Sequence, residues 1–188
     1  MTVTQNRIPD ADRRWMRFAV LALGAITAIS GAAPLLVRAL ADNSNAPSVQ
    51  ITSAGVQPRQ IEDDTQQKIS KIYSRSWQDL DNGLSKNDAS ALAPSFIGFA
   101  RDRYVNQIKA QQASGISSHV IARKHDAKAV FYSVEGSAIE IHDNVEVERQ
   151  ILDGSKVVAS EIKMVPYVAV LSTTDDGWKI RLLEQAQD

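Results

Sequence analysis

The sequence predicts an α+β domain that follows one N-terminal membrane-spanning segment. Three observations lead to this prediction: an uncharged apolar run over residues 18–37, a helical spacing of apolar residues over about 60–114, and an alternating spacing after Gly115. Helices that precede a series of antiparallel strands are typical of a sheet covered by helices on one face. We therefore expect three helices packed on a curved, four-stranded antiparallel sheet.

The apolar run is long enough to cross a membrane once. Its 20 residues, Phe18 to Val37, would extend about 30 Å as a helix, which is the thickness of the hydrocarbon core. Four arginines precede the run, whereas only Arg38 follows it closely. The positive-inside rule therefore keeps residues 1–17 in the cytoplasm as a basic tail and exports the rest of the chain. We expect an inner (plasma) membrane protein whose C-terminal domain is extracytoplasmic.

A cleaved signal peptide is the alternative interpretation of the same run. Ala39-Leu40-Ala41 has the small-x-small pattern that signal peptidases cut, and cleavage at Ala41 would give a secreted or periplasmic protein. The apolar core of a signal peptide usually has about 7–15 residues, so the longer run favours an uncleaved anchor. Under both interpretations the domain that follows lies outside the cytoplasm.

The composition excludes several kinds of chemistry. The chain has 188 residues, a formal net charge of −1 and no cysteine. A nucleic-acid-binding domain normally has a basic excess, which is missing here, so we expect no nucleic-acid partner. Without cysteine there is no disulfide, iron–sulfur cluster or thiol nucleophile. Glycine-rich phosphate loops and serine nucleophile motifs are also absent, and we expect no cofactor.

The first part of the exported region predicts a linker and then helices. Residues 38–58 are rich in Ser, Asn, Pro, Ala and Gly and lack a helical period, which indicates a linker before a domain at 59–188. Apolar residues three and four apart predict an amphipathic helix over roughly 60–83.

Two shorter helices are expected next. Asn87-Asp88 can cap a helix near 89–93, which Pro94 interrupts. Ser95 can cap the third helix, and Gly115 is a natural C-cap for it. Phe96, Ala100, Tyr104 and Ile108 recur at intervals of four residues and should form its buried face.

The remainder predicts four strands separated by tight turns. Glu135-Gly136, Asp153-Gly154 and Asp175-Asp176-Gly177 have the composition of hairpin turns. The strands between them should cover about 119–133, 137–152, 157–171 and 178–182. Pro166 cannot donate to a sheet ladder and requires an edge position or a bulge. We expect Trp77 and Trp178 to pack near one another and hold the first helix to the sheet.

This order of elements resembles the NTF2-like (cystatin-like, cone-shaped) superfamily over about Arg59 to Glu184. The closing "DDGWKIRLLE" is similar to the final hairpin of those domains, and "WQDLDNGLSKNDASALAPSF" is similar to their opening helices. With the N-terminal span, the chain resembles the Mce-associated membrane proteins of bacterial lipid-import systems and, less closely, the VirB8-like subunits of type IV secretion machines. Both resemblances imply an accessory or assembly role and no enzymatic activity.

Two hypotheses of function follow from the residues and the resemblance. The first is a non-catalytic scaffold, anchored by residues 18–37, that binds other proteins of a bacterial cell-envelope complex for transport or secretion; the resemblance also implies a homodimer formed through the sheet. The alternative is a small-ligand-binding or SnoaL/ketosteroid-isomerase-like pocket protein. Its pocket candidates are Asp143 and Arg149, which share the apolar parity of their strand, together with Tyr104, Tyr132 and Tyr167.

No metal site is expected from the histidines. His125-Asp126 and His142-Asp143 are the only His–carboxylate neighbours in the sequence. Adjacent residues of a strand point to opposite faces, so neither pair can easily chelate one ion.

Overall fold

The computed structural model describes residues 49–186 of the chain. The predicted cytoplasmic tail (1–17), the predicted membrane span (18–37) and residues 38–48 of the predicted linker lie outside this part. Among the described residues, no helix is both long enough and apolar enough to cross a membrane. The described part contains two α-helices, a short 3-10 helix and one six-stranded sheet.

Two of the three predicted helices are α-helices. Helix α2 spans Asp63–Ser85 and helix α3 spans Gly98–Ser114, whereas the second predicted helix is the 3-10 helix η3, Ala89–Leu92. The predicted cap is confirmed, because the Asp88 carboxylate accepts a hydrogen bond from the backbone N–H of Ser90 at 2.9 Å. Gly115 ends α3 in the left-handed conformation with φ of 69°, as expected of a C-cap.

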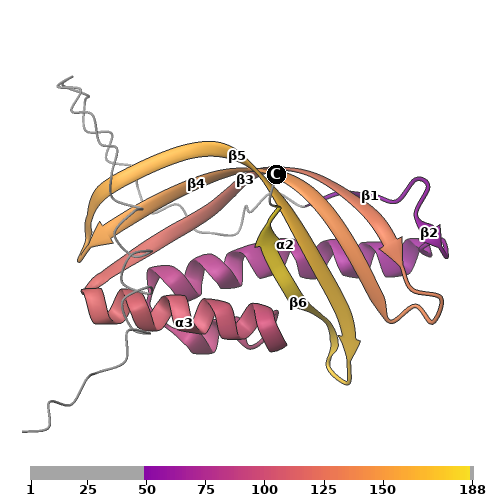
Figure 1. Cartoon of the computed structure of the whole chain (residues 1–188), viewed down its shortest axis with the longest axis horizontal. Helices are drawn as coiled ribbons and strands as arrows, with labels where there is room; N and C mark the ends of the chain where they lie inside the picture. The colour runs from indigo at the N-terminus through magenta and orange to yellow at the C-terminus, as the bar shows by residue number, and fades with distance from the viewer. Residues whose placement is uncertain (1–48, 187–188) are drawn as a thin grey trace, which may run out of the picture. The chain divides into compact units, whose positions relative to one another are not determined.

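The helices bury the faces that their sequence period predicts. The side chains of α2 that enter the core are three or four residues apart: Ile69, Tyr73, Trp77, Leu80 and Leu84. On α3 the buried face consists of Ala100, Tyr104 and Ile108. Both helices lie on the concave side of the sheet (Figure 1).

Four long strands form a meander in sequence order. They are β3 (Ile116–Tyr132), β4 (Ala138–Asp153), β5 (Lys156–Thr174) and β6 (Gly177–Gln185). Each pairs antiparallel with the next, and the connecting turns fall where the sequence predicts hairpins. The α+β architecture, with helices inside a strongly curved sheet, is the cone that the NTF2-like resemblance implies.

The predicted four-stranded antiparallel sheet is wrong in one respect, because two short strands make it mixed. Strand β1 (Ile51–Thr52) and strand β2 (Gln57–Pro58) both pair parallel with β3. They lie within the predicted linker 38–58, so the folded domain begins at least ten residues earlier than residue 59. The physical reason is that Val49, Ile51 and Val56 are apolar and enter the core, although polar residues and glycine surround them in the sequence.

Bulges curve the sheet and change which residues face the core. The pairing register shifts twice between β3 and β4, once between β4 and β5, and once between β5 and β6. Such bulges bend strands and increase their twist. In β6 the extra residue is Arg181, so Leu183 is fully buried, and not Leu182, which strict alternation from Ile180 would place in the core.

Ser95 does not cap α3, contrary to prediction. The residue is buried, and its backbone carbonyl accepts a hydrogen bond from the N–H of Ile180 at 2.8 Å. The N–H of Ile97 donates to the carbonyl of Ile180 at 2.9 Å. Residues 95–97 therefore pair with β6 as an extended segment, and α3 begins only at Gly98.

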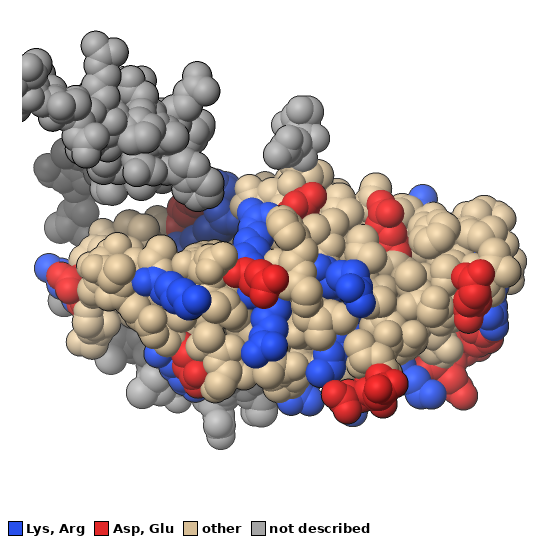
Figure 2. Space-filling model, turned by 60° about the horizontal axis from the view of Figure 1, so that its bottom comes forward, with Lys and Arg blue, Asp and Glu red and all other residues tan. Residues whose placement is uncertain are grey.

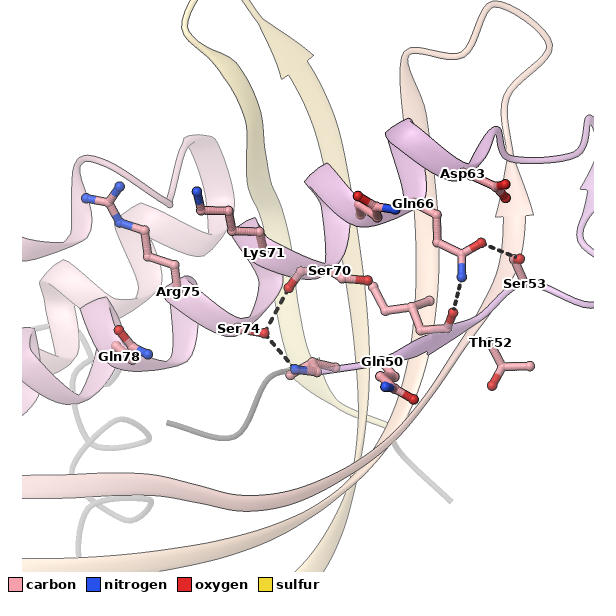
Figure 3. Close-up of a pocket in the computed structure, with 13 residues that line it drawn as sticks. Gln50, Thr52, Ser53, Asp63, Gln66, Ser70, Lys71, Ser74, Arg75 and Gln78 are labelled. Carbon is pink, nitrogen blue, oxygen red and sulfur yellow. Dashed lines mark hydrogen bonds between the residues drawn. The ribbon is translucent and has the colours of Figure 1, made fainter. Parts of the chain in front are cut away.

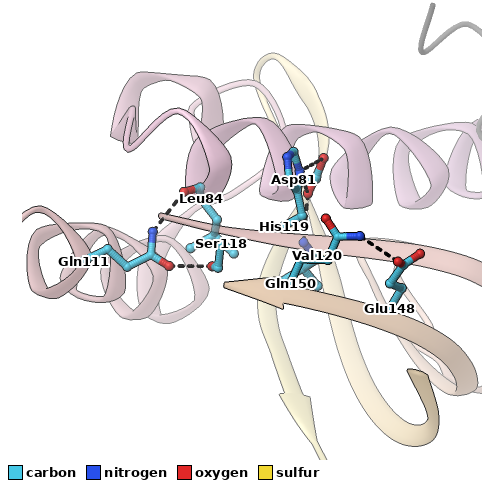
Figure 4. Close-up of polar contacts among 8 residues, drawn as sticks. All are labelled: Asp81, Leu84, Gln111, Ser118, His119, Val120, Glu148 and Gln150. Carbon is cyan, nitrogen blue, oxygen red and sulfur yellow. Dashed lines mark hydrogen bonds and ion pairs between the residues drawn. The ribbon is translucent and has the colours of Figure 1, made fainter. Parts of the chain in front are cut away.

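Helix residues cover the outer edge of β3 where β1 and β2 do not reach. The Asp81 carboxylate accepts from the backbone N–H of Val120 at 2.8 Å and lies 3.0 Å from Nδ1 of His119. Gln111 of α3 donates to the carbonyl of Leu84 at 2.9 Å and accepts from the hydroxyl of Ser118. Figure 4 shows these contacts joining α2, α3 and β3.

Pro166 lies where the prediction requires it, at an edge. Strand β6 pairs with β5 only from Tyr167 to Thr174. Before Tyr167, β5 has β4 on one side and no described strand on the other. The missing N–H of Pro166 therefore costs no ladder hydrogen bond.

The surface carries charges of both signs. Figure 2 shows acidic and basic side chains interspersed on the face that it displays, without a continuous area of one sign. This distribution agrees with the net charge of −1. The absence of a nucleic-acid partner stays a prediction.

Replacing Ile51 tests whether the segment before residue 59 belongs to the domain. Ile51 is 2% exposed, so Ile51→Ala should lower the free energy of unfolding by about 2–4 kcal/mol through lost burial and a residual cavity. Thr52→Ala, at an exposed neighbour in the same strand, should change it by less than about 0.5 kcal/mol. Urea unfolding of the full chain in mild detergent, followed by circular dichroism, measures both. Equal effects would mean that this segment is only a linker.

Candidate functional site

Asp143 of β4 is the centre of a buried polar cluster inside the cone. Its Oδ2 accepts a hydrogen bond from the Tyr73 hydroxyl at 3.0 Å and lies 2.6 Å from Nδ1 of His125. Its Oδ1 accepts from the backbone N–H of Asp126 at 3.0 Å. Both carboxylate oxygens therefore have partners supplied by the protein.

The position of this cluster follows from strand geometry. Asp143 has the same parity as Ile139, Ile141, Val145 and Val147, which all face the helices. His125 pairs with Val145 and therefore lies on the same face, one strand away from Asp143. Helix α2 supplies Tyr73 from the opposite side of the core.

Aromatic rings enclose the polar groups. Trp77 packs edge-on against His125 and against Tyr167, with ring centroids 5.6 Å and 5.0 Å apart. Tyr73 packs edge-on against Trp77 at 6.3 Å. The side chains of His125 and Asp143 are only 5% and 0% exposed, so the rings separate this pair from solvent.

Burial and the nearby carboxylate change the ionisation of Tyr73. Loss of water around the phenol, reinforced by the negative charge of Asp143, raises the pKa of Tyr73 well above its ordinary value of 10.0. Tyr73 therefore stays protonated at physiological pH and remains a hydrogen-bond donor to Asp143.

The five pocket candidates do not form one site. Arg149 reaches the cluster only indirectly, by donating to the Tyr167 hydroxyl at 2.9 Å. Tyr104 lies on α3 and donates to the carbonyl of Leu183 in β6 at 3.2 Å. Tyr132 lies at the β3–β4 turn, where its hydroxyl donates to the carbonyl of Gly136 at 3.3 Å.

The two tryptophans belong to different aromatic groups, contrary to the expectation that they pack together. Trp77 contacts Tyr73, His125 and Tyr167 at the centre of the domain. Trp178 packs instead against Tyr132, with centroids 6.4 Å apart. Of the two tryptophans, only Trp77 packs between the first helix and the sheet, a position that was expected of both.

Sequence reasoning selected Asp143 but missed the residues that bind it. His125 and Tyr73 complete the cluster, and Trp77 covers it. A hairpin turn at Glu135-Gly136 places residues near 125 opposite residues near 145, so strand parity could have suggested the His125–Asp143 pair. No local signal brings Tyr73 to the same point, because its contact with Asp143 joins residues 70 positions apart.

Apart from the central cluster, a hollow lies between β1 and the outer side of α2. It has a volume of about 1000 Å³ and polar walls, which include Gln66, Ser70, Lys71, Ser74 and Arg75 (Figure 3). Most of the polar groups at its base bind the protein itself. Gln66 donates to the carbonyl of Ile51 at 2.7 Å, and the Ser74 hydroxyl accepts from the N–H of Val49 at 2.8 Å. These contacts attach β1 to α2 and do not form a catalytic constellation.

The Asp143 carboxylate has no oxygen free for catalysis. A general base needs an accessible acceptor atom, but the Asp143 oxygens are occupied and shielded from solvent. Among residues 49–186, no group of three or more His, Asp or Glu side chains could hold a metal ion. In contrast to the Asp143 oxygens, the buried indole nitrogen of Trp77 has no acceptor in hydrogen-bonding geometry among the described residues.

Comparison with known proteins gives similarity of fold only. No protein-family model and no curated protein matches the chain. The intermembrane-space region of the chloroplast protein ARC6 aligns with a TM-score of 0.59 and 14% identity, over 70% of this chain and 100% of that domain. This likeness shows that the described domain shares the fold of that region.

Two further solved structures align with lower TM-scores. A putative dehydratase of the NTF2-like family from Streptomyces avermitilis aligns with a TM-score of 0.44 and 11% identity, over 64% of this chain and 94% of its own. A protein of unknown function with a cystatin-like fold from Nostoc punctiforme aligns with a TM-score of 0.42 and 10% identity, over 69% of this chain and 96% of its own.

Replacing Asp143 tests whether the cluster is structural. Asp143→Ala leaves the Tyr73 hydroxyl, the Asp126 N–H and His125 without their buried acceptor, so the free energy of unfolding should fall by about 3 kcal/mol or more. Asn144→Ala, at the exposed next residue of β4, is the matched control and should change it by less than about 0.5 kcal/mol. Urea unfolding in mild detergent measures both. An Asp143→Ala protein as stable as the control would contradict the structural role.

The pH dependence of stability should report the buried phenol of Tyr104. Burial raises its pKa well above the ordinary 10.0. Above about pH 10 the unfolded chain therefore releases a proton that the folded chain keeps, and stability falls by about 1.4 kcal/mol per pH unit for this residue. Tyr104→Phe should make the decline between about pH 10 and pH 12 shallower by that amount. Parallel declines in urea unfolding at several pH values would show that Tyr104 ionises normally.

Proposed function

We propose that this chain is a non-catalytic, membrane-anchored accessory or scaffold subunit that binds protein partners in a bacterial cell-envelope complex. The observation that carries the proposal is that both oxygens of the buried Asp143 carboxylate are occupied by protein donors. The side chain best placed to act as a base, Asp143, instead binds Tyr73, His125 and the backbone of residue 126. Because these hydrogen bonds of Asp143 stabilise the domain, we assign the binding of partners to its outer surface.

The surface supports recognition of proteins. Several large apolar side chains are about half exposed on the sheet and its turns, among them Phe131, Val134, Ile162 and Met164. Exposed apolar groups of this size are typical of interaction surfaces when they cluster. Ile162 and Met164 alternate with Glu161 and Lys163, and this mixture of apolar and charged groups would make a partner surface specific.

The N-terminal segment and the comparison support the proposed location. The uncharged run over residues 18–37 and the arginines before it favour an anchored domain outside the cytoplasm. The ARC6 domain with the same fold is described as an intermembrane-space region. An anchor would also raise the local concentration of the domain near membrane-bound partners.

One observation favours the second candidate function, a small-ligand-binding protein. The buried indole N–H of Trp77 lacks an acceptor among the described residues. A small molecule bearing an oxygen could accept this hydrogen bond inside the cone.

Affinity purification of the tagged full chain from membranes in mild detergent tests the proposal. We expect an uncleaved chain that carries residues 1–17 and the same envelope proteins in repeated preparations, identified by mass spectrometry. A tagged, unrelated single-span protein is the control for adventitious capture. Recovery of a soluble chain that begins at Asp42 without partners would refute both the anchor and the complex, and a small molecule retained in native mass spectra would favour the alternative.

A further inference from the structure

We propose that the open edge of β5, residues 159–165, pairs with the same edge of a second copy of this chain. Among residues 49–186, no strand lies beside this open β5 edge, because β6 pairs with β5 only from Tyr167 onward. Other described segments contact the outer edge of β3 at Val120, 127–128 and 131–132, and that of β6 at Ile180. The inference concerns self-association and does not depend on the proposed function.

The backbone of the open β5 edge can extend the sheet. The carbonyl of Pro166 accepts from the N–H of Ala186 at 2.9 Å, so the backbone of Pro166 faces the side on which β6 lies. Backbone direction alternates along a strand, and Met164, Ile162 and Ser160 therefore direct their N–H and C=O groups to the same open side. A row of such groups is a template for another strand.

Apolar side chains accompany these backbone groups. Ile162 and Met164 are 52% and 56% exposed, on the convex face of the sheet beside Ile121, which is 37% exposed. Edge strands that avoid pairing usually carry few exposed apolar residues. An added β5 strand would pack Ile162 and Met164 of the second copy against these apolar side chains.

The charges identify the second strand as a copy of β5. Glu161 and Lys163 are half exposed, and their charged atoms lie 3.2 Å apart within one chain. In an antiparallel pair with Ile162 opposite its own copy, Glu161 lies opposite Lys163 twice, in positions where side chains are closest. Centring the pair on residue 161 or 163 instead places like charges opposite one another, which is destabilising.

Both ends of this register stop naturally. It pairs residues 159–165 only, because the position opposite Pro166 is already occupied by Ala186, whose N–H donates to the Pro166 carbonyl. Val158 of the second copy, the extra residue of the bulge between β4 and β5, therefore leaves the ladder at this point. A bulge also bends the strand, which turns the β4–β5 turn of one copy away from Ala186 of the other. Such a dimer joins edges and differs from one in which sheet faces pack together.

Cysteine cross-linking of the full chain in mild detergent tests the register, because the natural chain has no cysteine. Ile162→Cys should form a covalent dimer with itself under mild oxidation, since paired residues lie within disulfide range. Ser160→Cys and Met164→Cys should each fail alone, and a mixture of the two should cross-link. Equal cross-linking of Ser160→Cys alone and Ile162→Cys, or none with Ile162→Cys, would overturn the proposal.

Charge reversal tests the choice of partner by an independent route. Glu161→Lys and Lys163→Glu should each raise the dimer dissociation constant about tenfold or more, as measured by light scattering after size exclusion. The double variant Glu161→Lys/Lys163→Glu restores opposite charges and should return to the parental value. A parental chain that is monomeric at about 50 μM, or a double variant weaker than both single ones, would overturn the proposal. A monomer that still recovers envelope proteins would leave the proposed function standing.

Discussion

The burial of one face of α2 against the concave side of the sheet is the contact on which the rest of the domain depends. Long strands with one apolar face need a cover, and a single helix is marginal in water without such packing. Helix α2 runs beneath the sheet with Ile69, Tyr73 and Leu84 fully buried. Each buried side chain of this size contributes about 1.5–3 kcal/mol. The bulges in β3 to β6 give the sheet the curvature that this contact requires.

Differences in strand length determine what remains accessible at the surface. Strand β5 has 19 residues and β6 has nine, so half of β5 extends past its neighbour. The domain covers its other edges with short segments: β1 and β2 along one end of β3, Asp81 further along it, and residues 95–97 beside β6. Within the described part of the chain, residues 159–165 of β5 have no strand beside them, and they carry both apolar and complementary charged side chains.

A charged residue inside the core needs hydrogen-bond partners, as do the backbone groups at the edge of a sheet. A buried carboxylate is costly unless hydrogen bonds replace the water that it loses. Asp143 obtains these bonds from two different elements: Tyr73 on α2, and on β3 both His125 and the backbone N–H of Asp126. The cluster therefore fixes how the helix sits on the sheet, because a shifted helix would leave the carboxylate without a donor. The same arrangement occupies both oxygens of the Asp143 carboxylate.

The sequence by itself determined the features that depend on local chemistry. Turn residues such as Asp153-Gly154 bound the strands, helical spacing predicted the buried faces of α2 and α3, and Pro166 required an edge. Strand parity also placed Asp143 on the inner face. Each of these depends on a residue and its near neighbours, so it can be read without knowing the fold.

Only the tertiary structure decided which distant segments meet. The parallel pairing of Ile51 with β3, the pairing of Ser95 and Ile97 with Ile180, and the meeting of Tyr73 with Asp143 join parts of the chain that no local pattern connects. Bulges add a second limit, because one extra residue such as Arg181 exchanges Leu182 for Leu183 in the core. Packing of the whole sheet sets where such a residue is inserted, and the alternating pattern of a single strand does not contain that information.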